Sequence, residues 1–169
     1  MDTGYKFPTT NGNPYNDWVN PTNAYSNNSI YATYPWGTNA FHPNYGEHTF
    51  KTFGFSIPAG ATINGIEVTV RGYSDYTSNA ARVTLFGIGG GTGTQISKTM
   101  PSSNGDIVFG GDTSLWGKTW TANDFLDANF GTHIVAFVGS SAGKTMWIDS
   151  ASIKVYYTPL PPSNFFLLF

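Results

Sequence analysis

The sequence contains no cysteine, and this absence excludes several kinds of chemistry. A disulfide framework, a thiolate metal site and a thiol nucleophile all require cysteine side chains. A secreted domain of this size commonly carries at least one disulfide, but the lack of cysteine alone does not define the redox compartment. The chain must therefore fold without covalent cross-links.

Charged residues are scarce as well, at 11% of the chain, whereas an average protein has about a quarter. The 8 Lys and Arg residues are scattered singly along the sequence, and the formal net charge is −2. A nucleic-acid partner requires a concentrated basic face, and a membrane-surface helix requires basic residues along one side. We therefore expect neither nucleic acid nor a membrane as a partner.

Long apolar runs are also missing. The stretch FFLLF at 165–169 has only five residues, whereas roughly 20 are needed to span a bilayer. The first residues, MDTGYKFPTT, have neither the charged n-region nor the apolar h-region of a signal peptide. These features predict a protein that is synthesised in a cytoplasm without a signal peptide.

The sequence is instead rich in aromatic and small polar residues. Phe, Trp and Tyr make up 17% of the chain, and Gly, Asn, Ser and Thr fill much of the remainder. This composition is typical of a β protein with many turns, whose surfaces bind through hydrogen bonds and stacking rather than charge. At 169 residues the chain suits one domain with a sizeable core.

A period of two, typical of strands with one buried and one wet face, recurs along the chain. In the segment 63–73, for example, Ile66, Val68 and Val70 fall on one side. About eight such segments predict an all-β fold, a single jelly-roll-like β-sandwich of two antiparallel four-stranded sheets. The predicted strands lie within 30–34, 48–57, 63–73, 80–88, 95–100, 106–111, 132–139 and 146–158. Further residues on apolar sides are Phe53, Phe55, Ile57, Ala81, Val83, Leu85, Ala151, Ile153, Val155 and Tyr157.

The same pattern divides the chain into three parts. Residues 1–29 are polar, rich in Asn and Pro and without a period, which indicates an N-terminal arm or wrapping loops. Residues 30–158 form the predicted β-sandwich. Residues 159–169 form a hydrophobic C-terminal tail.

One segment inside the predicted sandwich favours a helix. In WTANDFLDANFG, Thr121 can cap a helical turn at residues 122–126, with Asp124 three residues on as its reciprocal partner. The segment is too short for more than one turn or slightly more.

The sequence does not indicate a catalytic or nucleotide site. GSSAGKT at 139–145 has one residue too few for a phosphate-binding loop, and strand-like residues follow it, so we interpret it as a hairpin turn. Asp124 and Asp127 are explained by the helical turn, and Asp149 by a place at the rim of the last strand. We therefore predict a non-enzymatic protein without a cofactor. The histidines, which lie in unrelated contexts, are His42, His48 and His133.

A structural metal ion is not indicated by any defined spacing, and no metal site is predicted. Asn104, Asp106 and Asp112 flank turns, and jelly-roll domains can hold calcium with such oxygen ligands. A structural calcium therefore stays an open alternative.

The aromatic residues are too many for one small core, so some must be exposed or meet partners. Trp116, Trp120 and Trp147 adjoin strand or helix-turn signals and are predicted to be core residues. Exposed rings have two competing uses, as anchors of a protein interface or as a platform against sugar rings. The candidates, all in the irregular N-terminal third, are Tyr15 and Trp18 for protein partners and Trp36 and Tyr45 for glycans.

Four quoted stretches carry a resemblance to a known group of proteins. They are WVNPTNAYSNNSIYATY, FSIPAGATINGIEVTVRG, LWGKTWTANDFLDANFG and IDSASIKVYYT, which together extend over roughly residues 18 to 158. The chain resembles a recurrent β-sandwich of tailed-phage and prophage proteins. This resemblance implies a virion structural role in capsid decoration, tail or fibre, although similar domains also occur in extracellular bacterial proteins. The N-terminal arm and the C-terminal tail are what this chain adds.

The apolar tail has three explanations: it packs on its own sandwich, anchors in a membrane or docks into another subunit. Its length excludes the anchor. The preceding PLPP at 159–162 is a stiff spacer, which favours projection towards a neighbour. Burying five large side chains contributes about 8–15 kcal/mol gross, against about 1–2 kcal/mol per residue for ordering them. The predicted docking residues are Phe165, Phe166, Leu167, Leu168 and Phe169.

The expected function is thus that of a capsid cement or decoration protein at the virion surface. Its arm and tail would clamp the major capsid protein, other virion subunits or sister copies, the copies forming a homo-oligomer such as a trimer. One alternative is a carbohydrate-binding sandwich on a fibre or a cell surface, and another is a tail or baseplate component. A glycan-array screen separates the decoration protein from the carbohydrate-binding sandwich.

Overall fold

The computed structural model describes residues 1–36, 45–88, 92–126, 130–137 and 143–161, with only the backbone of residues 13–16. These residues form nine strands and two short 3₁₀ helices. No helix among them is long and apolar enough to cross a membrane. The strands are β1 (Thr10–Asn16), β2 (Ala32–Pro35), β3 (Tyr45–Lys51), β4 (Thr62–Ser74), β5 (Ala80–Phe86), β6 (Ile96–Thr99), β7 (Gly105–Gly111), β8 (Gly131–Phe137) and β9 (Thr145–Thr158). The helices are η1 (Pro21–Ala24) and η3 (Ala122–Phe125).

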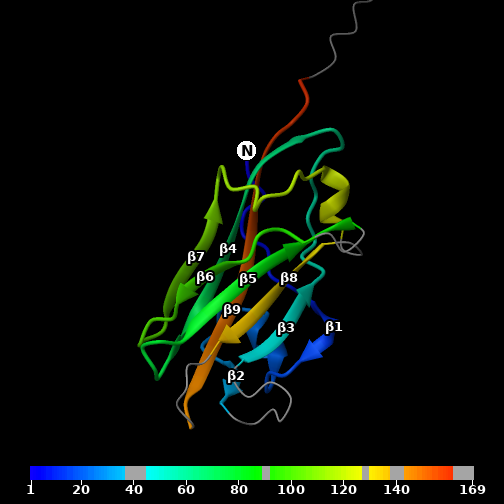
Figure 1. Ribbon diagram of the computed structural model, residues 1–169. Coiled ribbons are helices and arrows are strands. Elements are labelled where there is room, and N and C mark those ends of the chain that lie inside the picture. The colour runs from blue at the N-terminus through cyan, green and yellow to red at the C-terminus, as the bar shows by residue number, and fades with distance from the viewer. Residues whose placement is uncertain (37–44, 89–91, 127–129, 138–142, 162–169) are drawn as a thin grey trace, which may run out of the picture.

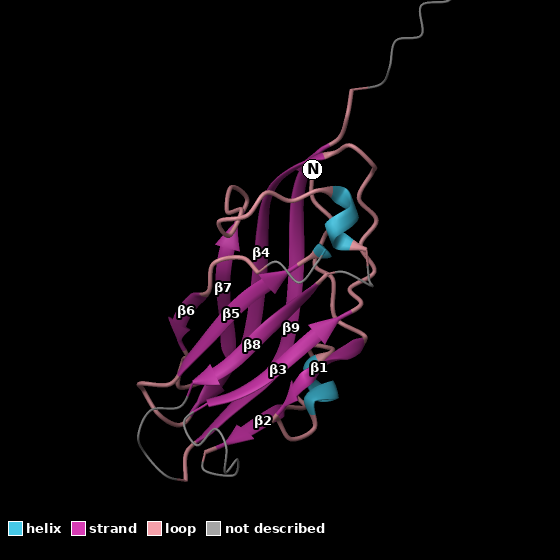
Figure 2. Cartoon of the chain, turned by 45° about the vertical axis from the view of Figure 1, so that its right-hand side comes forward, coloured by secondary structure: helices cyan, strands magenta, loops and turns pink. Residues whose placement is uncertain are grey.

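The strands form two antiparallel sheets that pack face to face (Figures 1 and 2). One sheet has five strands in the order β1-β3-β8-β5-β6, and the other has four in the order β2-β9-β4-β7. The predicted all-β sandwich is therefore confirmed, with nine strands where about eight were expected and with sheets of five and four strands. We call the solvent side of the larger sheet the five-strand face and that of the smaller sheet the four-strand face.

The core lies between the two sheets and follows the predicted alternation. Ile66, Val68 and Val70 of β4 are fully buried, and the apolar residues predicted for β5 and β9 lie beside them. Such complete burial contributes about 1.5–3 kcal/mol per large aliphatic side chain. The period of two in these strands therefore also fixes which residues reach the two outer faces. The other predicted core residues that are fully buried are Ala81, Val83, Leu85, Ala151, Ile153 and Val155.

Residues 1–29 are not a separate arm, contrary to the expectation from their lack of period. β1 is the outermost strand of the five-stranded sheet and pairs with β3. Lys6 exchanges backbone hydrogen bonds of 2.8 and 2.9 Å with Ile153 of β9. Strand β1 was not predicted because its sequence, TNGNPYN, contains few apolar residues. Its pairing with β3 holds it in the sheet.

The stretch 52–57 is not a strand, although its alternation predicted one. β3 ends at Lys51, and Thr52 takes a left-handed backbone conformation with φ of 59°. Phe53 is buried, and Phe55 and Ile57 pack partly buried against the core, so the alternation reflects packing of an irregular segment.

The predicted helical turn is confirmed as the 3₁₀ helix η3. The Asp124 carboxylate accepts hydrogen bonds from the backbone N–H of Thr121 (2.9 Å) and from that of Ile88 (3.1 Å). Burial raises the pKa of Asp124, but these bonds and one from Lys118 outweigh it, so this pKa lies below its usual value. The predicted cap is thus also a junction between η3 and the end of β5.

Candidate functional site

The five-strand face is a regular grid of outward-facing side chains from β3, β8 and β5. Strand register places their outward residues side by side, and rows follow one another every two residues, about 6.8 Å apart. The first and last rows are therefore about 20 Å apart. The rows are Tyr45–Phe137–Ala80, Glu47–Val135–Arg82, Thr49–His133–Thr84 and Lys51–Gly131–Phe86.

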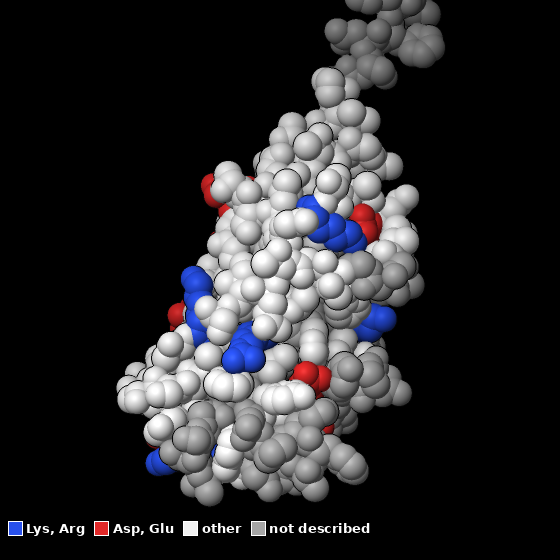
Figure 3. Space-filling view, in the orientation of Figure 1, with Lys and Arg blue, Asp and Glu red and all other residues white. Residues whose placement is uncertain are grey.

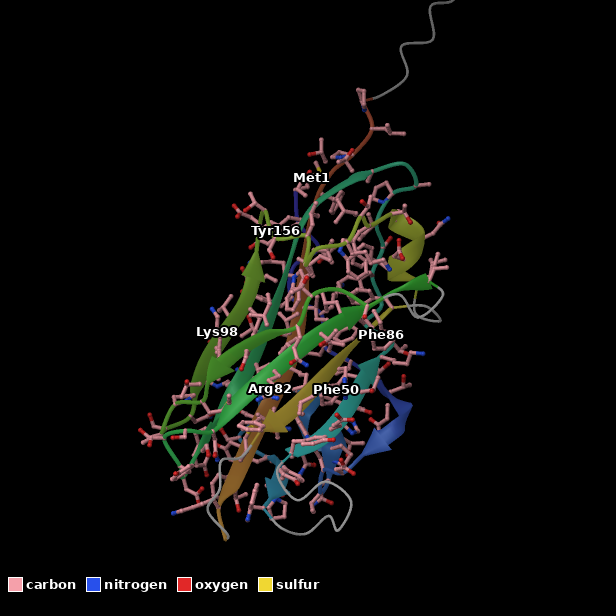
Figure 4. All side chains as sticks on the ribbon, in the orientation of Figure 1. Met1, Phe50, Arg82, Phe86, Lys98 and Tyr156 are labelled. Carbon is pink, nitrogen blue, oxygen red and sulfur yellow. The ribbon has the colours of Figure 1, made fainter. Side chains whose placement is uncertain are left out.

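Aromatic rings lie at both ends of this grid. Tyr45 and Phe137 are cross-strand partners at one end, and both are half-buried. Phe86 lies at the other end, where a Cβ on Gly131 would stand 2.2 Å from the tip of its ring. Gly131 therefore leaves the space that lets Phe86 lie across the sheet, and the Lys51 ammonium sits 5.7 Å from the centroid of that ring. Figure 4 labels Phe86 and Arg82 at separate points of β5.

Arg82 is held in place by an aromatic ring. Its guanidinium carbon is 3.9 Å from the centroid of the Phe137 ring, which is the geometry of a cation–π contact. Stacking uses the flat side of the guanidinium and leaves the in-plane N–H groups available as donors. Arg82 also flanks Val135, which is outward-facing but only 5% exposed.

Glu47 and His133 form the polar centre of the face. His133 Nε2 lies 3.5 Å from a Glu47 carboxylate oxygen. Burial lowers the pKa of His133, and the Glu47 carboxylate only partly offsets this, so the pKa stays below its usual value. At neutral pH the imidazole is therefore neutral, with one donor and one acceptor nitrogen.

Charge on the five-strand face is sparse and mixed. Figure 3, in the same orientation as Figure 1, shows a few basic and acidic side chains, some alone and some next to one of opposite sign, on a mostly uncharged surface. Together with the rings, Glu47, His133 and Arg82 give planar polar groups that can hydrogen-bond a neutral ligand without a strong field of one sign.

The predicted contact residues are only partly brought together. Tyr45 lies on the five-strand face, whereas Trp36 continues the inward phase of β2 and packs partly buried against the core. The pair predicted for glycan binding is thus divided between an outer face and the interior. The sequence could not show this, because Trp36 follows β2 of the four-stranded sheet, whereas Tyr45 begins β3 of the five-stranded sheet.

The residues predicted for protein contacts have different outcomes. Trp18 is 4% exposed, stacks on His48 and donates a hydrogen bond of 3.1 Å from Nε1 to the Gly46 carbonyl. It is a core residue, so its expected place at a contact surface is wrong. Tyr15 lies in β1, but its side chain is outside the described part of the structure, as are all residues of 165–169.

The core tryptophans were predicted correctly in two of three cases. Trp116 and Trp120 are 3% and 5% exposed. Trp147 instead faces outward on the four-strand face, half-buried, with its ring stacked on that of Tyr73 at 4.8 Å and 7°. The edge of Tyr31 meets Tyr73 at 5.5 Å. Trp147 was misassigned because it adjoins Met146 and Ile148, which do point inward.

His48 has a structural role in the interior. It is fully buried, its Nε2 lies 3.3 Å from Asn11 Oδ1, and it packs against Trp18 and Phe50. Burial lowers the pKa of His48 to about 4, and the neighbouring His133 adds to this, so His48 is neutral in the fold. His42 lies outside the described residues.

Of the residues weighed for calcium, Asp106 contacts a guanidinium and Asn104 contacts Asp149. Arg71 donates from Nη1 to Asp106 at 2.8 Å, and its Nε is 3.5 Å from the buried Asp149. Asn104 donates to the same Asp149 carboxylate at 3.3 Å. Within the described segments, no three His, Cys, Asp or Glu residues are grouped so that they could hold a metal ion.

A groove of about 560 Å³ lies at the end of the sandwich near η3. Its walls include Ile63, Leu115 and Trp120, together with the turn Ala59–Ala61. Leu160 packs against Gly60 of this turn, since a Cβ on Gly60 would stand 2.6 Å from its Cδ1. The lining is mainly apolar and carries no ionisable side chain.

Comparison with known proteins gives distant structural similarities. The chain is similar to the CBM36-1 domain of a multidomain xylanase from the hindgut metagenome of Trinervitermes trinervoides, with 13% identity and a TM-score of 0.43 over 95% of this chain and 100% of that one. A structure titled "CBM4 structure and function" matches at 18% identity and a TM-score of 0.44, over 89% and 93% of the two chains. The N-terminal cellulose-binding domain of β-1,4-glucanase C from Cellulomonas fimi matches at 13% identity and 0.43, over 94% and 90%.

No protein-family model matches the chain, and no curated protein does. Function is therefore argued below from the chain's own residues.

Proposed function

We propose that this protein binds carbohydrate, and that the five-strand face is the binding surface. The observation that carries the proposal is the grid itself, in which rings at both ends flank a centre of planar polar side chains. Ligand sites combine aromatic walls with a few polar groups that fix orientation. A glycan needs both, because each sugar has apolar C–H surfaces and a rim of hydroxyl groups.

The roles of the individual residues follow from their chemistry. Tyr45 and Phe86 offer ring surface for stacking at opposite ends of the grid. Arg82 supplies N–H donors and Glu47 supplies acceptors, while neutral His133 lies beside Glu47 with its Nε2 buried. Because a hydroxyl both donates and accepts, such a mixed set suits a neutral polyol better than an ion.

The shape of the grid favours a chain rather than a single sugar. Its rows extend for about 20 Å along the strands, which is long enough for several linked sugar rings. We therefore infer an extended glycan that lies parallel to β3, β8 and β5, without a chemical reaction.

A glycan array tests the proposal, with the wild type and the variant Arg82→Ala. We expect specific signals from the wild type and a loss of at least about tenfold in affinity for Arg82→Ala, equivalent to about 1.4 kcal/mol. Lys98→Ala is the matched control, because it removes an exposed cation from the neighbouring strand β6 outside the grid. Silence across the array, or equal binding by Arg82→Ala, contradicts the proposal.

A second candidate is a virion structural role in which residues 165–169 dock into a neighbouring subunit. It is favoured by exposed apolar residues near the last described residues of the chain, where Leu115 is 38% and Leu160 is 64% exposed. Exposed apolar residues gathered at one place are typical of contact surfaces. In this role the partners are capsid or other virion subunits, or sister copies.

Deletion of residues 160–169 tests this second candidate. The truncated protein should keep its far-ultraviolet circular dichroism spectrum and its melting temperature, but lose co-sedimentation with phage particles or its self-association in light scattering. If the truncated protein still occupies particles fully and keeps its oligomeric state, the docking role is wrong. Glycan binding on the five-strand face is unaffected by this deletion, so the two candidates are tested separately.

A further inference from the structure

The four-strand face holds a small hollow of about 190 Å³ that plays no part in the proposed glycan grid. Its floor comes from the outward residues of β4, β9 and β7, in two adjacent rows of the sheet. One row joins Ser152, Thr69 and Val108, and the next joins Ser150 and Asp106 through Arg71. The remaining walls are Tyr5, Phe7 and Asn27 from the N-terminal segment.

The walls of the hollow are fixed by contacts of their own. The Tyr5 hydroxyl donates to the Glu67 carboxylate, and the Lys154 ammonium lies 4.4 Å from the centroid of the Tyr5 ring. Lys6, between the two aromatic walls, is hydrogen-bonded through its backbone to Ile153. The hollow is therefore built by the fold and does not depend on a loose surface loop.

The floor of the hollow carries hydroxyl groups in buried positions. Ser150 and Ser152 are only 4% and 6% exposed. Thr69 Oγ1 is also buried, and it has no hydrogen-bond partner among the described residues. A buried polar atom without a partner is costly, so this hydroxyl needs a water or a ligand in the hollow.

Charge in the hollow is already neutralised, which restricts the kind of ligand. The lining residues include no cation, and the adjacent Arg71 is engaged by Asp106 at 2.8 Å and by Asp149 at 3.5 Å, which disfavours an anionic ligand. Asp106 is the one carboxylate of the lining, and it holds Arg71, which disfavours a metal ion. An apolar ligand would leave the Thr69 hydroxyl without a partner.

We propose that this hollow is a second binding site, which takes a single neutral sugar ring. The Phe7 and Tyr5 rings would contact the C–H surface of the sugar. Thr69, Asp106 and Asn27 would hydrogen-bond its hydroxyl groups. The volume of about 190 Å³ is below the range of about 300–1,000 Å³ of sites for larger ligands, so the hollow suits one ring and not a chain.

The sugar ring bound in the hollow has two sources: it is either the terminal residue of a glycan or a free monosaccharide. This site is independent of the proposed function, because it lies on the opposite face and shares no residue with the grid. Nuclear magnetic resonance titration of the ¹⁵N-labelled protein can distinguish both the site and the source. The probes are glucose, galactose, mannose and N-acetylglucosamine, each as the free sugar and as its methyl glycoside, with glycerol as the control for unspecific polyol binding.

We expect amide shifts confined to the strands around Thr69, Ser150 and Ser152 with at least one sugar, and not with glycerol. Binding of the methyl glycoside identifies a terminal residue of a glycan, and binding of the free sugar alone identifies a monosaccharide. If no probe, or glycerol equally well, shifts these amides, the hollow is not a sugar site.

Thr69→Val is the decisive variant, since it keeps the shape of the side chain and removes only the hydroxyl. Because this hydroxyl has no hydrogen-bond partner among the described residues, the melting temperature should be unchanged or higher, while the sugar should bind at least tenfold more weakly. Thr84→Val, the matched change on the five-strand face, should leave this site's affinity unchanged. Equal sugar affinity of Thr69→Val and the wild type overturns the proposal. The test of the hollow does not depend on the glycan array, because the array tests binding to the five-strand face.

Discussion

The two outer faces of the sandwich arise from the same alternation of residues, yet their polar groups are held differently. On the four-strand face, contacts run from the sheet to the N-terminal segment. Asp149 accepts hydrogen bonds from the backbone N–H groups of Asn28 (3.0 Å) and Ser29 (2.7 Å), and Glu67 accepts one from Tyr5. On the five-strand face, Glu47 and Arg82 instead contact neighbours within the same sheet, His133 and Phe137.

This difference separates polar groups that tie the sheet to the N-terminal segment from polar groups that contact neighbours within their own sheet. A buried carboxylate with two backbone donors is part of the architecture, and its removal leaves those donors unsatisfied. The Glu47 side chain is 15% exposed and lies beside a neutral histidine, so it gains little from an ion pair. The comparison therefore predicts effects on stability for one face and effects on binding for the other.

The largest effect is expected for Asp149→Ala. This change leaves the N–H groups of Asn28 and Ser29 without their acceptor and Arg71 without one of its partners. The free energy of unfolding should fall by about 2–4 kcal/mol. Urea denaturation measures this loss. Glu47→Ala, on the other face, should cost less than about 1 kcal/mol. Similar losses for the two variants would remove the distinction between the faces.

The next largest effect concerns two histidines, one pointing inward and one outward. The pKa of His48 is lowered to about 4 in the fold from 6.5 in the unfolded chain. The unfolded chain therefore binds more protons between these values, and stability is lost as pH falls from 6.5 towards 4. The expected loss is about 1–3 kcal/mol.

Thermal unfolding at a series of pH values measures this effect. His48→Gln removes the titrating group, so its stability should depend less on pH in this window, although it starts lower. His133→Gln should change the pH dependence less than His48→Gln does, because His133 lies at the surface of the sheet beside Glu47. An equally steep pH dependence in His48→Gln would show that another group is responsible.

A smaller effect separates two arginines. Arg82→Lys keeps the charge but loses the flat stack on Phe137, so glycan affinity should fall by about tenfold without a change in melting temperature. Arg71→Lys should do the reverse, lowering the free energy of unfolding slightly and leaving glycan affinity unchanged. Calorimetry on both variants measures the two quantities. If both variants lose stability and neither loses glycan affinity, the two faces do not differ in this way.

The smallest effect is the coupling between Tyr73 and Trp147 on the four-strand face. These rings are directly opposed across β4 and β9 and stack at 4.8 Å. A double-mutant cycle with Leu at both positions should give a coupling of about 0.5–1 kcal/mol. Glycan affinity should not change in any of the variants. A loss of affinity would extend the binding surface to this face.

The fold was largely predictable from the sequence because burial imposes a period that can be read directly. Ile66, Val68 and Val70 alternate with polar residues, and this pattern fixed both the strand and its inner side. β1 was missed because its own residues show no apolar alternation, and hydrogen bonds to β3 hold it in the sheet. The stretch 52–57 was misjudged because irregular chain can also bury alternate residues.

The candidate site was much less predictable, because it depends on register between strands that are distant in sequence. Arg82 and Phe137 are 55 positions apart, and nothing local to either indicates that they meet. The outward phase of β3, β5 and β8 could have suggested Glu47, Arg82 and His133 as surface residues. Sequence alone could not have placed them in adjacent rows.

The position of β9 has a consequence for how the chain reaches its native state. β9 pairs with β4 on one side, and on the other it is bonded in turn to β2, Tyr25 and the first six residues. During synthesis all of these earlier segments leave the ribosome before the strand that completes their hydrogen bonds. The four-stranded sheet must therefore assemble late, from contacts that are distant in sequence, and chaperones that shield nascent β-strands should increase its yield.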